Sequence, residues 1–153
     1  MFWYVWNNDS DSAMLTTVST ALELTGWMQA IAPSPWLPGM PEEATRSRLA
    51  GGLFVSFNDG SSLESRESLF ADVRAEARFF TDSEGQTFEH EEHGLSLDGF
   101  LVPPNRPLLI RVGFDFWCDF RFWDDGDATG GGHFDRIACP GVIVIASPVQ
   151  TIQ

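Results

Sequence analysis

The longest regular pattern in the chain is an alternation of apolar and polar positions between Leu108 and Trp123. Every even position from 108 to 122 is apolar, whereas the odd positions carry two Arg, two Asp and two Trp. Because successive side chains of a β-strand point to opposite faces, this period of two predicts a strand with one face on a core.

A second apolar run, 137–146, follows an acidic, glycine-rich segment, and we expect the two runs to form a β-hairpin. In the register that keeps both apolar faces on the core, Cys118 faces Cys139, and a slip of two residues also satisfies burial. The two cysteines then form either a disulfide or a pair of buried thiols. The absence of a usual export signal favours the thiols.

Other segments also favour strands. The run 52–57 ends at Asn58-Asp59-Gly60, a strong turn signal. Residues 66–80 fit both period two and a helix, and the turn-forming sequence after them favours the strand. Residues 87–102 predict one or two short strands. The fold expected is mainly β: an antiparallel, jelly-roll-like β-sandwich.

The first 50 residues are expected to form an N-terminal arm that packs on a β-sandwich domain of residues 51–153. The arm begins with an aromatic strand, and the spacing of apolar residues over 13–31 predicts an amphipathic helix after it. A proline-rich connector follows at 33–41, and 41–50 predicts a short helix.

Aromatic residues of the arm are candidates for an interface, because a bare aromatic terminus invites association. A first strand that lies on its own sheet is the alternative, and it is favoured because an uncovered aromatic terminus would be prone to aggregation. The interface candidates are Phe2, Trp3, Tyr4, Trp6 and Trp36.

The composition of the chain limits the classes of molecule that it is expected to bind. The 153 residues carry a net charge of −13, and all nine basic residues are Arg. Such a surface repels phosphate backbones and anionic lipid headgroups, so nucleic acid is not an expected partner. No stretch approaches the roughly 20 apolar residues of a membrane span. Without a usual signal peptide, a cytoplasmic or assembly-associated protein is expected.

The acidic segment between the two apolar runs supplies Asp124, Asp125 and Asp127. Carboxylates on a flexible loop suit calcium, although the spacing is not that of an EF-hand. Asp and Gly are also the ordinary residues of turns, and a plain turn is the favoured interpretation.

Histidines provide a second metal-site pattern. His90 and His93 flank two glutamates, and His133 is a distant third ligand for zinc. A metallohydrolase is therefore a minor alternative, and a solvated acidic segment is favoured. We find no serine elbow, phosphate loop or Cys–His motif, and we expect no enzyme and no required cofactor.

Trp117 and Trp123 fall on the polar face of the strongest strand. Outward tryptophans stack on sugar rings or enter protein interfaces. The first hypothesis is thus a non-enzymatic structural subunit of a shell, virion or surface assembly that self-associates. The second is a carbohydrate-binding module that uses these two rings, with or without calcium.

Overall fold

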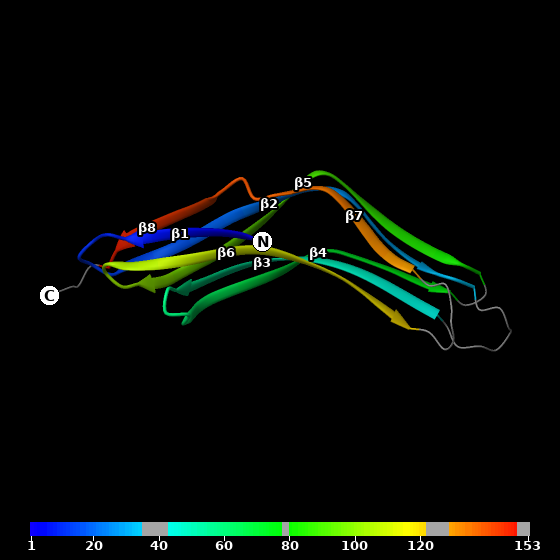
Figure 1. Ribbon diagram of the computed structural model, residues 1–153, viewed down its shortest axis with the longest axis horizontal. Coiled ribbons are helices and arrows are strands. Elements are labelled where there is room, and N and C mark those ends of the chain that lie inside the picture. Colours follow the sequence, from blue (N-terminus) through cyan, green and yellow to red (C-terminus); the bar gives the residue numbers. More distant parts are fainter. Residues whose placement is uncertain (35–42, 78–79, 122–128, 150–153) are drawn as a thin grey trace.

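The computed structural model describes residues 1–34, 43–77, 80–121 and 129–149, and these contain strands and no helix. Figure 1 shows two long, curved layers that lie face to face. The strands are β1 (Phe2–Asn8), β2 (Met14–Ala32), β3 (Glu43–Phe57), β4 (Ser62–Ala77), β5 (Asp82–Val102), β6 (Arg106–Arg121), β7 (Thr129–Ala138) and β8 (Val142–Pro148).

All the strand pairs are antiparallel and form two sheets, as a β-sandwich requires. Sheet A has the order β1-β6-β3-β4. Sheet B has the order β5-β2-β7, and β8 pairs with the first half of β2, in line with β7. The mainly β class predicted from the sequence is confirmed.

The core lies between the sheets in two clusters. One cluster gathers around Leu22, Leu53 and Ile110, and the other around Leu24, Leu49 and Phe88. Phe70 and Phe114 pack against both clusters and join them. Burying these side chains on the inner faces stabilises the fold, at about 25 cal/mol for each Å² of apolar surface removed from water.

The predicted helix over 13–31 is wrong, because that segment is the central strand β2. Its even positions are buried from Thr16 to Ala32, which is a period of two. Polar or small residues at several buried positions and outward Leu15 and Trp27 obscured this alternation in the sequence. The short helix expected over 41–50 is also wrong, since β3 begins at Glu43.

The hairpin predicted between 108–123 and 137–146 is wrong as well. β6 lies in sheet A between β1 and β3, whereas β7 and β8 both pair with β2 in sheet B. The chain therefore crosses from one sheet to the other between Arg121 and Thr129. Cys118 and Cys139 do not face each other, and both are free thiols.

Three sequence predictions agree with the strands observed. The 66–80 segment is a strand up to Ala77, within β4. The strand predicted from Leu108 is β6. A turn lies at Asn58–Gly60, where the Gly60 N–H donates to the Phe57 carbonyl at 3.0 Å. The segment 87–102 belongs to one long strand, β5, instead of two short ones.

Candidate interaction surface

One open edge of the sandwich is formed by β1 of sheet A and β8 of sheet B. Each of these strands pairs with one neighbour among the described residues, β1 with β6 and β8 with β2. Figure 1 draws the two strands close together at one end of the molecule. The Tyr4 hydroxyl of β1 donates to the Cys139 carbonyl, just before β8, at 3.2 Å. We call this surface the β1–β8 edge.

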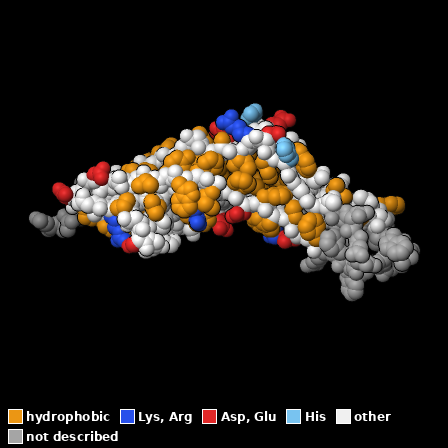
Figure 2. All heavy atoms as spheres, viewed as in Figure 1, with side chains coloured by type: hydrophobic (Ala, Val, Ile, Leu, Met, Phe, Trp, Pro, Cys, Tyr) orange, Lys and Arg blue, Asp and Glu red, His pale blue; other side chains and the backbone are white. Residues whose placement is uncertain are grey.

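Alternate side chains of β1 and β8 point outward and stay exposed, while the others pack on the core. Met1, Trp3 and Val5 are 66%, 61% and 65% exposed. Ile143 and Ile145 on β8 are 63% and 61% exposed. In Figure 2 the hydrophobic side chains run along the middle of the face in view, and charged ones lie mainly toward its margins.

The strands of this edge carry no charged side chain of their own, and the neighbouring charge is Arg111 of β6, whose guanidinium lies 5.8 Å from the Trp3 ring centroid. There is no Asp, Glu, Arg or Lys in 2–8, in 142–149, or in 14–20, the part of β2 that pairs with β8. Leu15 of β2 is 48% exposed and extends the apolar surface beside β8. In a chain with a net charge of −13, this is a surface that another acidic molecule approaches without local repulsion.

The opposite edge of the sandwich, where β4 meets β5, is protected by carboxylates. The backbone N–H of Arg74 donates to Glu84 Oε2 at 2.8 Å, and that of Glu76 donates to Asp82 Oδ2 at 2.9 Å. These donors belong to the outer edge of β4 and would otherwise be open to pairing with another chain. Covering an edge with charged side chains is a known protection against such pairing.

The inward residues of β1 explain why it holds its place. Phe2, Tyr4 and Trp6 pack against the core, so they are structural contacts and only Trp3 of the four points outward. The pKa of Tyr4 is raised to about 12, mainly by its hydrogen bond to the Cys139 sulfur and to a smaller extent by burial. Trp36, the remaining interface candidate, lies outside the described residues.

Trp117, a candidate for stacking on sugars, lies half-buried on β6. The Arg48 guanidinium lies 4.9 Å from its ring centroid, and Arg48 also forms an ion pair with Asp119. That ring therefore already has a cation over it. Trp123 lies outside the described residues, as do the calcium candidates Asp124, Asp125 and Asp127.

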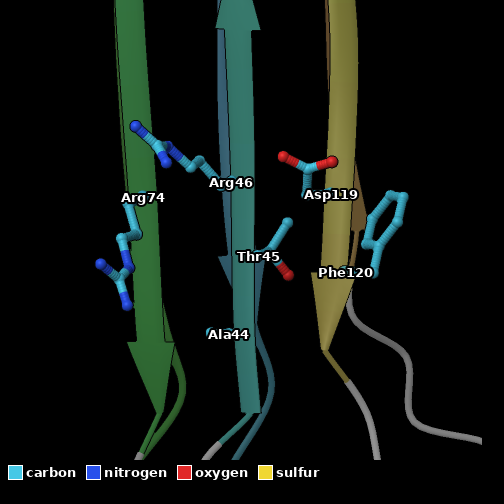
Figure 3. Close-up of a pocket in the computed structure, with 6 residues that line it drawn as sticks. All are labelled: Ala44, Thr45, Arg46, Arg74, Asp119 and Phe120. Carbon is cyan, nitrogen blue, oxygen red and sulfur yellow. The ribbon is translucent and has the colours of Figure 1, made fainter.

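A polar hollow of about 330 Å³ lies at the far end of sheet A from β1. Figure 3 shows Arg46 on β3, Arg74 on β4 and Asp119 on β6 around it. Arg46 donates from Nε to Asp72 at 2.6 Å, and this bond holds the pKa of Asp72 below its ordinary value. Arg74 pairs with Glu76 on its own strand, so both arginines here have carboxylate partners, and the Arg46–Asp72 pair joins β3 to β4.

The three histidines are kept apart by separate contacts. His90 Nδ1 lies 3.3 Å from Thr25 Oγ1, His93 stacks on Phe70, and His133 Nε2 lies 3.0 Å from Asp135. Within the described ranges, no three His, Cys, Asp or Glu residues lie close enough to hold a metal ion.

The two thiols have hydroxyl neighbours. Cys118 Sγ lies 3.3 Å from Ser47 Oγ, and Cys139 Sγ lies 3.1 Å from Thr20 Oγ1. The sequence did not single out these serine and threonine partners, because they lie on strands distant in the chain. Both are structural contacts of half-buried thiols.

Comparison with protein-family models, curated proteins and solved structures found no match to this chain. In the part of the chain that the structure describes, no helix is long and apolar enough to cross a membrane.

Proposed function

We propose that the protein is a non-enzymatic structural subunit that self-associates through the β1–β8 edge. The observation that supports this proposal is the asymmetry between the two edges of the sandwich. Carboxylates cover the backbone donors of β4 at one edge, whereas the other edge exposes uncharged, apolar side chains. Soluble monomers usually protect both edges, so an unprotected one supports association.

Large exposed hydrophobic side chains at this end of the molecule lie on or beside the outward faces of both sheets, with exposed fractions between 47% and 66%. The contributing residues of this end of the molecule are Met1, Trp3, Val5, Leu15, Leu101, Ile143, Ile145 and Val149.

Shells, virions and surface layers are the assemblies in which such a subunit would serve. They are built from many copies of small β domains, and jelly-roll sandwiches are common among viral shells. The jelly-roll-like strand order stays a prediction for this chain. A surface that adds no charge suits close packing of acidic copies.

Light scattering after size exclusion tests this proposal. We expect the untagged protein to be a defined oligomer, and Ile145→Arg to reduce its mass to that of one chain. The matched control is Leu69→Arg, which changes a similarly exposed residue on β4 and should leave the mass unchanged. A wild-type monomer at all concentrations would overturn the proposal.

Deleting the first six residues is a poorer test. All of β1 from Phe2 to Asn8 pairs with β6, and its inward aromatic residues pack on the core. The deletion would therefore unfold one side of sheet A, and loss of an oligomer would follow for that reason alone.

A further inference from the structure

Only half of the residues of β8 direct their backbone N–H and C=O groups toward β2. Val149 N–H donates to the Ala13 carbonyl at 3.0 Å, and the pairing of β8 with β2 continues from there without a register shift. In an antiparallel pair, residues alternate between those that bond to the partner strand and those whose N–H and C=O point away. The odd residues of β8 therefore bond to β2, and Val142, Val144 and Ala146 direct their N–H and C=O to the open side.

Two prolines bound this open segment. Pro140 precedes β8 and Pro148 is its last residue, and they lie at equal distances in sequence from Val144. Proline has no N–H, so neither residue can donate to a neighbouring strand. The open donors thus form a short row that is symmetric about Val144.

We propose that β8 pairs antiparallel with β8 of a second copy of this chain, around a two-fold axis at Val144. Sheet B then continues across the axis from one copy to the other, in the order β5-β2-β8-β8-β2-β5. In this register Val144 pairs with its own equivalent and Val142 pairs with Ala146, which gives about six hydrogen bonds between the copies. Each Pro140 lies opposite a Pro148, so two residues without donors face each other.

Side chains favour the same register. On the outer face Ile143 lies opposite Ile145 of the second copy, twice, at the closely spaced positions of an antiparallel pair. A slip by two residues in either direction replaces these contacts with one pair of identical isoleucines and two pairs that involve Gly141 or Ser147. It also sets an open carbonyl of β8 against a proline.

Symmetry and charge indicate that the strand that pairs with β8 comes from a second copy of this chain. A two-fold interface uses the same patch on both molecules, and this row of donors and acceptors is complementary to itself. Two copies with a net charge of −13 each repel, and β8 with the paired half of β2 brings no charge to the contact. The run Val142–Ala146 is also uncharged and rich in β-branched residues, which strongly favours strand pairing.

The inference rests on the proposed self-association. Ala146→Pro tests the pairing between the two β8 strands. This change removes an N–H that points to the open side, so pairing with β2 is retained, and proline is tolerated at such edge positions. We expect a folded protein with the mass of one chain. Wild type and Leu69→Arg serve as references.

A cross-link reports the register directly and does not depend on that variant folding. Ile143→Cys and Ile145→Cys proteins are mixed and oxidised, and the linked peptides are identified by mass spectrometry. We expect links between positions 143 and 145 to exceed those between two copies of position 143 at least tenfold. Links to the native Cys118 and Cys139 are scored separately.

The outcomes separate the two proposals. A wild-type monomer overturns both self-association and the β8 pairing. An oligomer that survives Ala146→Pro and shows no preferred 143–145 link overturns the β8 pairing alone, and would place the contact on β1 or on the outer face of a sheet.

Discussion

The side chain of Asn8 forms hydrogen bonds to three segments of the chain. We therefore expect its replacement to lower the free energy of unfolding more than that of most polar residues. It is 1% exposed, and its side-chain amide donates to the carbonyls of Ser12 (3.0 Å), Val102 (3.1 Å) and Pro103 (2.9 Å). Its side-chain oxygen accepts from the Ser10 hydroxyl at 2.7 Å. The end of β1, the turn before β2 and the end of β5 are thus joined through one residue.

Asn8→Ala removes these bonds and leaves buried carbonyls with fewer donors. A net hydrogen bond contributes about 1 kcal/mol and an unsatisfied buried group costs about 1–3 kcal/mol, so we expect a loss of about 2–4 kcal/mol in the free energy of unfolding. For a chain of this size that corresponds to a fall in Tm of roughly 5–15 °C.

Urea unfolding at fixed protein concentration measures the effect, and Asn7→Ala is the matched control. Asn7 is the same residue type on the same strand, but its side chain is exposed. We expect Asn7→Ala to change the free energy of unfolding by about 0.5 kcal/mol or less. Equal and small effects of the two substitutions would refute the argument for Asn8.

Four further predictions follow from particular contacts. Gly26→Ala should destabilise the protein by more than about 2 kcal/mol in urea unfolding, since the residue has φ +150° and a Cβ there would lie 2.2 Å from the His133 carbonyl oxygen, whereas Gly131→Ala, with open space around it, should be tolerated. Asp72 has a pKa lowered from 3.8, so its contribution to stability is complete above about pH 4 and is lost as pH falls through the lower folded value; Asp72→Asn should flatten the acid limb of a stability–pH curve. Removing the carboxylates of Asp82 and Glu84 together should open the β4 edge and give species larger than the wild-type oligomer in light scattering. Raising NaCl from about 20 mM to about 150 mM should strengthen the wild-type association, because salt screens repulsion between two acidic copies and the proposed contact has no ion pairs to weaken.

The strands with a regular alternation could be predicted from the sequence. From Leu108 to Phe120 of β6 the even positions are apolar without exception, and for the segment that forms β4 the turn-forming sequence after it favoured a strand over a helix. The turn at Asn58–Gly60 was also predicted, because its conformation depends on local residues alone.

β2 could not be predicted in this way, because its outward face is not polar. Leu15, Trp27 and Ile31 fall at outward positions, and Thr16 and Thr20 are buried. The outward Leu15 belongs to the same apolar surface as β8. The feature that hid the strand is therefore one that supports an interaction surface.

The partners of β6, β7 and β8 depend on contacts between distant segments. Sequence neighbours usually pair, and that rule gave the hairpin between β6 and β8. The chain instead changes sheets after Arg121, and β2, more than 100 residues earlier than β8, fills the place of the expected partner. Nothing local to either run encodes that exchange.

The alternation within β1 decides which of its aromatic residues are exposed. Trp3 points outward, whereas Phe2 and Trp6 pack on the core. The protected edge at β4 could not be foreseen, because Asp82 and Glu84 act there through the backbone N–H groups of another strand.

The native mass of the wild-type protein, measured by light scattering across a hundredfold range of concentration, tests the central claim most directly. A two-fold β8 contact predicts about 34 kDa, twice the 17.0 kDa of the chain, at the higher concentrations. A mass of one chain throughout the range would contradict the claim that the β1–β8 edge joins copies of this protein.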